Sequence, residues 1–563
     1  MQIRESILVL NIKSLPLTVI LPLSVLGFIA ISISTNIIPV HAATTIVVNS
    51  TADDQDNDGE CTLREAIVAS NTDIASGAAV GECLAGSGSD TINFNIQETA
   101  DFTNGGQDGY TISPTSALPD ITETVSINGY SQPGAQANTA IAPNPLNGIL
   151  LIELDGTNAG TPVDGIVING ASDVEVKGLV INSWSNEGIN INGNNATLAG
   201  CYIGTNPVGN TAQPNANIGV SGWGGIGNNA TIGGLNPEDR NLISGNGTTP
   251  QGSGLGWGDN HDYWVMQGNF VGVAADGLTP IPNSQPNGSG NPSIDNNNGA
   301  LVGGSTTGAI NVIGESLGHG IAPSNADNVV IEGNYIGFGY DGITLLGNTN
   351  GGGAGYGISL SSAENTSIKN NIVSGWASGG IAVTNGSSDV TVTGNTVTNN
   401  QGISNINLGG FPGLVENTTI QGNKIGTKTD GTIDNSITQS TGITVLGNVV
   451  DNTIGGVNPG DGNIIGGNTA AGIIVSELTV IGFGSFTPNN NSIIGNTILN
   501  NSSGNFFGAS TPGLGIDILS VTVDGTLALQ SSSQVGPTLN DTSDPDTGSN
   551  NYLNFPVINS TSA

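Results

Sequence analysis

Residues 366–399, TSIKNNIVSGWASGGIAVTNGSSDVTVTGNTVTN, contain one short motif twice, as Asn371-Ile372-Val373 and as Asn395-Thr396-Val397. The motif, an asparagine followed two residues later by isoleucine or valine, recurs along the chain. The other instances are Asn269-Phe270-Val271, Asn334-Tyr335-Ile336, Asn423-Lys424-Ile425 and Asn496-Thr497-Ile498. A short strand that follows an Asn or Gly turn and repeats at this kind of interval is typical of a parallel β-solenoid, in which each coil contacts only its neighbours.

The composition agrees with a solenoid. Glycine accounts for 88 of the 563 residues and charged residues for only 9%, while Ile, Val and Leu remain plentiful. Such a chain is too apolar and too weakly charged for disorder, so its glycines serve turns rather than a flexible linker. We therefore predict an all-β protein built as a single parallel β-helix, right-handed as parallel connections usually are.

The repeat also predicts how each coil is stabilised. Aliphatic side chains at alternate strand positions point into the bore, and their neighbours face solvent. Asparagine tolerates the left-handed backbone of tight turns, and stacked asparagine side chains can form hydrogen bonds from coil to coil.

The charge balance limits the partners. The chain has 44 acidic and 8 basic residues, a formal net charge of −36. This charge repels phosphate backbones and anionic lipid headgroups, so we expect neither nucleic acid nor a membrane surface as a partner. Neutral or cationic ligands and divalent cations are compatible with it.

The N-terminus predicts export. Residues 15–34 are almost wholly apolar and follow Arg4 and Lys13, and Val40-His41-Ala42 offers small residues at a cleavage site. We interpret residues 1–42 as a signal peptide, with an uncleaved N-terminal anchor as the alternative, and expect no membrane insertion beyond this segment. Export permits disulfides, and Cys61 and Cys83 are the expected pair, which leaves Cys201 as a buried free thiol.

A family resemblance covers nearly the whole mature chain. Residues 61–66, CTLREA, lie between a predicted strand near Thr45 and the alternating stretch 90–96, and the segment is similar to the N-terminal region of CSLREA-type exported bacterial proteins, with Thr62 in place of serine. Further matching stretches are 116–121, 125–129, 152–156, 513–517 and 554–557. The resemblance implies a right-handed parallel β-helix of the pectate-lyase-like superfold, with a cap before it. We expect a signal peptide at 1–42, a cap with one short helix at 43–110, the β-helix at 111–530 and an acidic segment at 531–563.

One stretch matches a calcium-binding pattern. Asp54, Asp56, Asp58 and Gly59, followed by Glu65, fit the twelve-residue loop D-x-D-x-D-G-x5-E, in which alternate carboxylates converge on the ion. A strand rather than a helix precedes this loop, and Glu65 also belongs to the CTLREA core. The alternative to a calcium site is an acidic solvated loop in which Glu65 begins a helix. A second acidic run, residues 541–548, has looser spacing.

An aromatic cluster suggests a sugar-binding surface, because flat aromatic rings beside carboxylates suit sugar stacking. The alternative is that the rings cover the side of a coil. The predicted carbohydrate-binding residues are Trp257, Asp259, His261, Asp262, Tyr263 and Trp264.

Enzymatic signatures are weak. Gly318-His319-Gly320 lacks the acidic pair and the basic residues that accompany such an element in polygalacturonases, and Asp341, Asp389 and Asp430 are candidates only because they lie in repeats. We therefore expect a monomeric exported protein, secreted or at the surface of a bacterium, that acts as a carbohydrate- or surface-binding rod. The alternatives are a polysaccharide lyase or glycoside hydrolase, and a purely structural surface component.

Overall fold

The computed structural model describes residues 43–534, except 224, 250–251, 260, 284–290, 315, 348–354, 433–440, 503, 507–508, 512–514 and 525–528. The predicted signal peptide, the acidic run 541–548 and all but the first four residues of the predicted C-terminal segment 531–563 lie outside the described residues.

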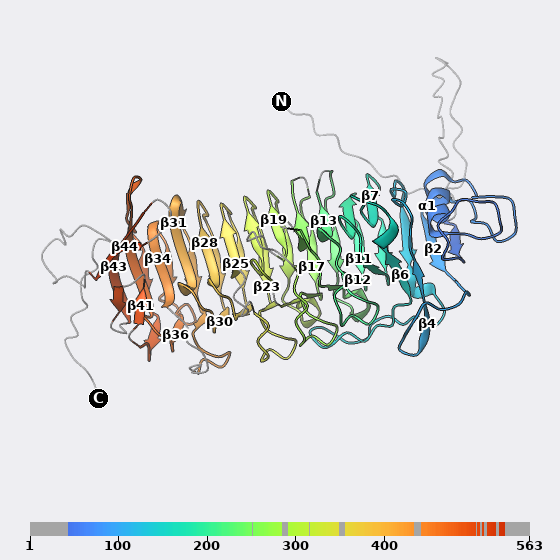
Figure 1. Cartoon of the computed structure of the whole chain (residues 1–563). Helices are drawn as coiled ribbons and strands as arrows, with labels where there is room; N and C mark the ends of the chain where they lie inside the picture. The colour runs from blue at the N-terminus through green and yellow to red at the C-terminus, as the bar shows by residue number, and fades with distance from the viewer. Residues whose placement is uncertain are drawn as a thin grey trace, which may run out of the picture. The chain divides into compact units, whose positions relative to one another are not determined.

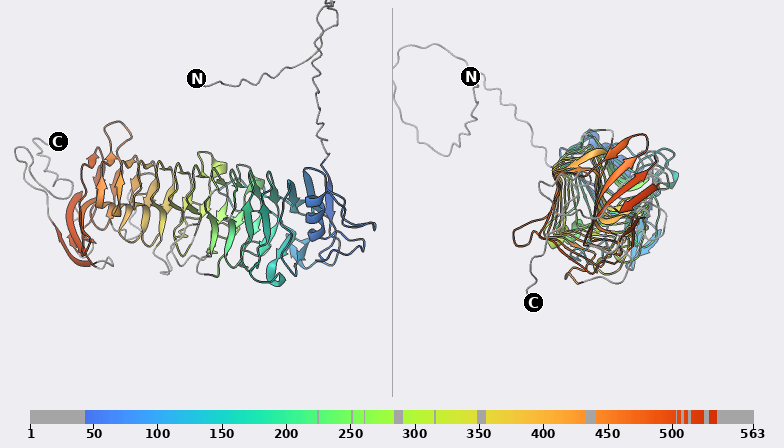
Figure 2. Two further views of the ribbon diagram at one scale, coloured as in Figure 1. Left: turned by 90° about the horizontal axis from the view of Figure 1, so that it is seen from above. Right: turned by 90° about the vertical axis from the view of Figure 1, so that its left-hand side faces the viewer.

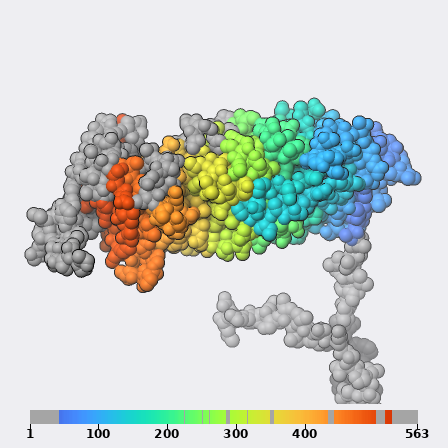
Figure 3. Space-filling view, turned by 90° about the horizontal axis from the view of Figure 1, so that it is seen from below, coloured from blue at the N-terminus to red at the C-terminus, as the bar shows by residue number. Residues whose placement is uncertain are grey.

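The described residues form a right-handed parallel β-helix, as predicted from the repeats (Figure 1). From β5 onward, each coil contributes one strand to sheet 1, one to sheet 2 and one to sheet 3, in that order along the chain. Figure 3 shows the coils following one another in chain order, from blue to orange. Seen along the axis in Figure 2, the sheets surround one interior.

The strands of sheet 1 all pair in parallel. They are β1 (Thr45–Val48), β2 (Asp90–Phe94), β5 (Val125–Asn128), β8 (Glu175–Lys177), β11 (Thr197–Ala199), β14 (Thr231–Gly233), β17 (Val265–Gln267), β20 (Leu301–Gly303), β23 (Val330–Glu332), β26 (Ser367–Lys369), β29 (Thr391–Thr393), β32 (Thr419–Gln421), β35 (Thr453–Gly455) and β39 (Ser492–Ile494).

Sheet 2 begins with an antiparallel hairpin, β3–β4, and continues in parallel. Its strands are β3 (Phe102–Asn104), β4 (Gln107–Ile112), β6 (Ile152–Asp155), β9 (Val180–Asn182), β12 (Tyr202–Ile203), β15 (Leu242–Ile243), β18 (Phe270–Val271), β21 (Val312–Ile313), β24 (Tyr335–Ile336), β27 (Ile372–Ser374), β30 (Thr396–Thr398), β33 (Lys424–Ile425), β36 (Ile464–Gly466) and β40 (Thr497–Leu499).

Sheet 3 ends in antiparallel pairs, β37–β38 and β43–β44. Its strands are β7 (Ile166–Asn169), β10 (Ile189–Asn192), β13 (Ile218–Gly222), β16 (Ser253–Trp257), β19 (Ser293–Asp295), β22 (Ala322–Ser324), β25 (Tyr356–Ser361), β28 (Gly379–Thr384), β31 (Ser404–Glu416), β34 (Thr441–Val450), β37 (Ile473–Val480), β38 (Gly484–Phe486), β43 (Ile516–Val523) and β44 (Leu529–Gln534). A separate hairpin joins β41 (Gly504–Phe506) to β42 (Ala509–Thr511).

Helical turns are few. The short 3-10 helices are η1 (Gly129–Ser131), η2 (Gly156–Asn158), η3 (Pro237–Asp239) and η4 (Thr307–Ala309). The α-helix α1 (Leu63–Thr72) lies between β1 and β2, and Thr62 and Glu65 form a capping box at its start. None of the helices in the described ranges has the length and apolarity needed to cross a membrane.

The cap is joined to the stack rather than set apart from it. Leu63 and Ile67 of α1 are buried in the same apolar cluster as the bore, and a disulfide links Cys61 to Cys83 with a Cα–Cα distance of 4.8 Å. Strands β1 and β2 are already members of sheet 1. The predicted cap boundary at residue 110 therefore falls inside β4.

Stacked aliphatic side chains fill the bore, as the alternation of the strands predicts. In sheet 1 the register aligns Ile331, Ile368, Val392, Ile420 and Ile454, one from each successive coil, and all five are fully buried. Burying such a side chain stabilises the fold by about 1.5–3 kcal/mol, so the interior stack is the main source of stability.

A ladder of buried asparagines, which we call the asparagine ladder, runs along the turn between sheets 1 and 2. The amide of Asn371 donates to Oδ1 of Asn395 at 3.0 Å, and that of Asn395 to Oδ1 of Asn423 at 3.0 Å. The members are Asn241, Asn269, Asn311, Asn334, Asn371, Asn395, Asn423, Asn463 and Asn496. Coil-to-coil asparagine bonding, predicted from the motif, is thus present.

Candidate functional site

Three of the predicted carbohydrate-binding residues lie in the interior, which corrects that part of the prediction. Trp257 and Trp264 are fully buried and stack on each other with ring centroids 4.8 Å apart. His261 is also fully buried, and its ring nitrogens contact the backbone oxygens of Asp259 and Ile191 at 2.8 and 3.0 Å. Side chains without solvent contact cannot stack on a sugar, so these three residues support the core instead.

The remaining members of that cluster lie on the outside. Tyr263 is exposed, and its hydroxyl accepts a hydrogen bond from Asn298 at 3.0 Å. Asp262 accepts from the backbone N of Asn298 at 2.8 Å. Asp259 is also exposed. Carbohydrate binding by Asp259, Asp262 and Tyr263 stays a prediction.

In the predicted calcium loop, the carboxylates bind nearby protein groups. Asp58 accepts from the backbone N of Glu60 at 2.9 Å, and Oε2 of Glu65 accepts from the backbone N of Thr62 at 3.0 Å. Oε1 of Glu65 is buried without a hydrogen-bond partner. Burial raises the pKa of Glu65, and the negative charges of Glu82 and Asp54 raise it further. Across the described ranges, no three His, Cys, Asp or Glu side chains are grouped to hold a metal. Calcium binding by Asp54, Asp56, Asp58 and Glu65 stays a prediction.

Two of the aspartates named from the repeats stabilise surface turns. Asp341 accepts from the backbone N of Thr344 at 2.8 Å, and Asp430 from that of Thr432 at 2.8 Å. Asp389 lies beside Asp327 and Glu364 in a shallow polar depression between sheets 3 and 1. These acids hold the backbone or face solvent.

A cleft on the outer face of sheet 3, lined by both polar and apolar groups, brings together residues from segments far apart in the sequence. It has a volume of about 350 Å³ and crosses β13, β16 and β19. The lining residues are Glu187, Asn217, Ile218, Trp223, Ser253, Gly256, Ser293 and Asp295. We call this the sheet-3 cleft.

Trp223 forms the aromatic part of the sheet-3 cleft. Its side chain is 38% exposed, whereas Trp184, Trp257, Trp264 and Trp376 are all buried. The indole lies over two glycines of the β16 segment: a Cβ on Gly256 would be 3.1 Å from Trp223 Nε1, and a Cβ on Gly258 would overlap the ring. Because these two glycines have no side chains, the Trp223 ring packs against their backbone, and part of the ring stays exposed to solvent.

Glu187 lies just before β10 and is 7% exposed. The hydroxyl of Ser221, on the neighbouring strand β13, donates to its Oε2. The backbone is fixed by Asp164, whose Oδ1 accepts from the N of Glu187 at 3.0 Å. Burial, opposed by the Ser221 hydrogen bond and assisted by the charge of Asp164, raises the pKa of Glu187 to about 7.

Asp295 is the second acid of the sheet-3 cleft. It ends β19, and its Oδ2 accepts from the Ser293 hydroxyl at 2.8 Å. Burial raises the pKa of Asp295, since it outweighs the Ser293 hydrogen bond, and the charge of Asp259 adds to the increase. Both carboxyls of the cleft thus hold their protons more tightly than free side chains do.

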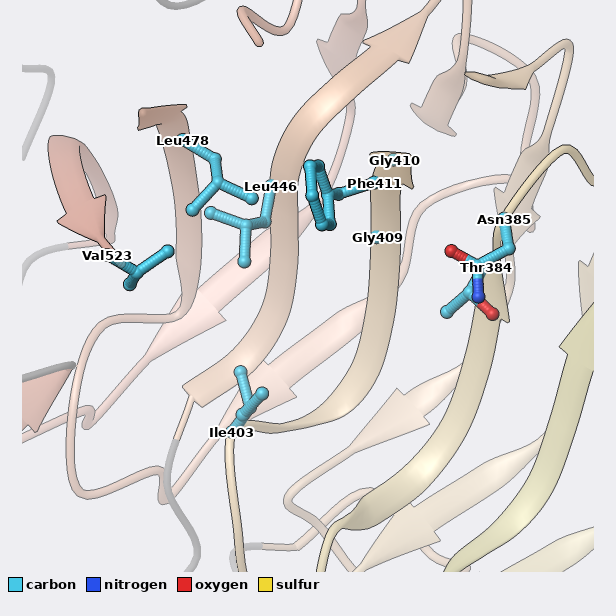
Figure 4. Close-up of a pocket in the computed structure, with 9 residues that line it drawn as sticks. All are labelled: Thr384, Asn385, Ile403, Gly409, Gly410, Phe411, Leu446, Leu478 and Val523. Carbon is cyan, nitrogen blue, oxygen red and sulfur yellow. The ribbon is translucent and has the colours of Figure 1, made fainter. Parts of the chain in front are cut away.

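A second, apolar depression lies nearer the C-terminal end of sheet 3. It has a volume of about 210 Å³, and Figure 4 shows Leu478, Leu446 and Phe411 side by side on consecutive strands, with Ile403 and Val523 around them. Its chemistry suits an aliphatic or aromatic group rather than a sugar. Gly409 and Gly410 also line it.

Sequence reasoning missed Glu187, Trp223 and Asp295. The available signal was alternation: Ile294 is buried in the bore, so Ser293 and Asp295 on either side of it face outward. The strand register that brings Glu187 near Ser221, across an interval of 34 residues, has no counterpart in the sequence.

A family model described as NosD, periplasmic copper-binding protein, matches residues 301–468, which is less than half of the chain. The matched residues run from β20 to β36, and the sheet-3 cleft lies before them in the sequence. No curated protein sequence matches this chain.

Several solved structures are similar to it. The Dettilon tailspike protein gp208 has a TM-score of 0.39 and 13% identity; the match covers 65% of this chain and 59% of the tailspike. A PL6 alginate lyase in complex with a trisaccharide has a TM-score of 0.33 and 12% identity, over 84% of this chain and 96% of the lyase. The A-module of the mannuronan C-5 epimerase AlgE4 of Azotobacter vinelandii has a TM-score of 0.29 and 13% identity, over 77% of this chain and 83% of the module.

Proposed function

We propose that this chain is an exported β-helix protein that binds a carbohydrate in the sheet-3 cleft. The observation that carries the proposal is the partly exposed ring of Trp223. The ring packs on glycines of the β16 segment, and Glu187 and Asp295 line the same cleft. An aromatic face with adjacent polar groups matches the two sides of a sugar ring, one apolar and one rich in hydroxyls. Export is supported by the N-terminal sequence, by the resemblance to CSLREA-type proteins and by the match to a periplasmic family.

Charge narrows the ligand to neutral or cationic sugars. Glu187 and Asp295 line the cleft, none of the lining residues that the structure describes is basic, and the chain carries a net charge of −36. A polyuronate would meet repulsion both in the cleft and on approach. Neutral oligosaccharides meet none, and the buried acids offer them hydrogen-bond partners.

Copper is not part of this proposal. Within residues 301–468, the segment similar to the copper-binding family, the sequence has one histidine, His319, and neither cysteine nor methionine. Copper sites in proteins are built from those three side chains, so the donors do not fit. His319 moreover accepts a hydrogen bond from the backbone N of Tyr356 at 2.9 Å.

Isothermal titration calorimetry of the purified protein tests the proposal. The ligands are neutral hexasaccharides of the cello, malto, manno, xylo and N-acetylchito series. We expect at least one series to bind and Trp223→Ala to weaken that binding at least about tenfold. Phe483→Ala, which removes another exposed aromatic ring far along the chain, is the matched control and should leave it unchanged.

Two results would contradict the assignment. If Tyr263→Ala abolished binding and Trp223→Ala did not, the sugar would bind at the exposed residues Asp259, Asp262 and Tyr263 instead of in the sheet-3 cleft. The absence of binding to every series would favour a purely structural surface component.

A further inference from the structure

We propose that the sheet-3 cleft also hydrolyses its glycan, with Glu187 as the proton donor and Asp295 as the base that activates water. This inference rests on the proposed function, because it requires a sugar to lie in the cleft. It goes beyond binding, and it assigns roles to two side chains that the sequence motifs do not mark.

The strand register fixes the spacing between the two acids. Ser221 on β13 pairs with Gly256 on β16, and Gly256 pairs with Ser293 on β19. Glu187 is held by the Ser221 hydroxyl and Asp295 by the Ser293 hydroxyl. The two serines that hold the carboxyls are therefore two strand spacings apart, about 9.5 Å, and the carboxyls bound to them are separated by a similar distance.

That spacing selects a mechanism. Inverting glycosidases hold their two carboxyls about 6.5–9.5 Å apart to leave room for a water molecule, and retaining ones only about 5–5.5 Å. Two strand spacings place the sheet-3 cleft at the upper limit of the wider range, and between the two acids Gly256 adds no side chain of its own beneath the Trp223 ring. The geometry therefore points to direct attack by water.

The reaction balances without a cofactor. Glu187 donates its proton to the glycosidic oxygen as the bond from that oxygen to the anomeric carbon breaks. Water attacks the anomeric carbon from the opposite face, and Asp295 takes the proton that the water loses. The products are two sugar chains, one with a new reducing end of inverted configuration, and the two acids return to their starting states through solvent.

The surroundings of Glu187 suit a proton donor. The side chain is 7% exposed, and burial raises its pKa to about 7, which keeps the proton in place in mildly acidic solution and on about half of the molecules at neutral pH. Among the described residues, the charged groups nearest Glu187 are Asp164, which precedes β7 and fixes its backbone, and Asp295, the other acid of the cleft. Both are acidic, and the charge of Asp164 favours the protonated form of Glu187.

The test measures new reducing ends released from every hexasaccharide that the protein binds, with the anomeric form of the product followed by proton NMR. We expect inversion, and a turnover that declines as the pH rises above about 7, because Glu187 then loses its proton. Glu187→Gln keeps an acceptor for Ser221, and it should lower kcat about 10²–10⁴-fold while changing the sugar affinity far less than Trp223→Ala does. Asp295→Asn should do the same.

Glu175→Gln is the matched control, because Glu175 also accepts a serine hydroxyl, that of Ser126, but on sheet 1. It should turn over like the parent protein. Binding without turnover, retention of configuration, or full activity in Glu187→Gln would each overturn catalysis by these acids and leave the binding proposal standing. Failure to bind any sugar would instead remove the proposed function itself.

Discussion

The side-chain amide of Asn371 donates a hydrogen bond to Oδ1 of Asn395 in the next coil, at 3.0 Å, while its own Oδ1 accepts from Asn334 of the coil before. Its Nδ2 also reaches the backbone oxygen of Ile331 at 2.9 Å. One side chain thus serves three coils in the interior, where an unpaired polar group is costly.

Replacing one member of the asparagine ladder should therefore destabilise the protein measurably. We expect Asn371→Ala to lower the free energy of unfolding by about 2–4 kcal/mol. The change removes the acceptor of the Asn334 backbone N and the donor to the Ile331 oxygen, and it opens a small cavity. Asn144→Ala removes an exposed asparagine with one hydrogen bond, to the Ile141 oxygen, and should cost much less. Equal losses in urea unfolding would contradict a special role for the ladder.

Cys201 occupies the place of an asparagine at the start of the asparagine ladder. Its Sγ lies 3.7 Å from the Val176 oxygen and 3.5 Å from the Ala199 oxygen, and the amide of Asn269 contacts the equivalent oxygens of Ile232 and Gln267 at 2.9 and 2.8 Å. We expect Cys201→Asn to extend the ladder and raise the free energy of unfolding by about 1 kcal/mol, with Cys201→Ala as the reference. A Cys201→Asn protein less stable than Cys201→Ala would show that the bore has no room for the amide.

Glu187 should make stability depend on pH. Because burial raises its folded-state pKa to about 7, the folded protein binds this proton more tightly than the unfolded chain. The stabilisation from this protonated carboxyl is complete below the ordinary pKa of a glutamate and is lost as the pH rises through about 7. The free energy of unfolding should fall by about 3 kcal/mol over this interval. We expect Glu187→Gln to reduce the loss in unfolding free energy between pH 5 and pH 8.

Glu175 provides a control of opposite sign for that measurement. Burial opposes ionisation there, but hydrogen bonds from Lys177 and Ser126 lower its pKa. The contribution of Glu175 to stability is present above the ordinary pKa of a glutamate and is lost as the pH falls through the lowered one. Glu175→Gln should therefore lower stability at neutral pH and change the pH dependence of stability only in the acidic range. An unchanged pH dependence in Glu187→Gln would argue that Glu187 ionises normally.

Calcium binding by the loop after β1 predicts a chelator effect. If Asp54, Asp56, Asp58 and Glu65 hold the ion, chelation should lower the melting temperature, since a ligand bound only to the folded state stabilises it. Asp56→Ala should remove this dependence, and Asp430→Ala, a turn aspartate elsewhere, should preserve it. Identical melting curves with and without chelator would retire the calcium prediction.

The architecture could be predicted from the sequence because the residues that build it repeat. The asparagines of the motif are the asparagines of the ladder, and the alternating aliphatics fill the bore. Cys201 could have been found the same way, because Gly200-Cys201-Tyr202-Ile203 has the pattern of Gly268-Asn269-Phe270-Val271.

The site could not be predicted so well, because it depends on register between coils of unequal length. Trp223 and Trp257 look alike in the sequence, but Trp257 pairs with Ile294 at a position that faces the bore, and Trp223 follows the end of β13 and folds back over glycines. Local density of aromatic residues therefore pointed to buried rings. The acids of the sheet-3 cleft come from coils whose intervening loops set no recognisable spacing.

The uniform geometry of the asparagine ladder makes the molecule divisible into interchangeable units. Asn371 and Asn395 are 24 residues apart, and each meets its neighbours through the same bonds, so excision of residues 371–394 would bring Asn395 under Asn334 with strand order and polarity preserved. A rod of this kind can be shortened or lengthened in steps of one turn. The sheet-3 cleft, whose lining lies between Glu187 and Asp295, would be carried along unaltered, so the length of the rod and the chemistry of the cleft can evolve separately.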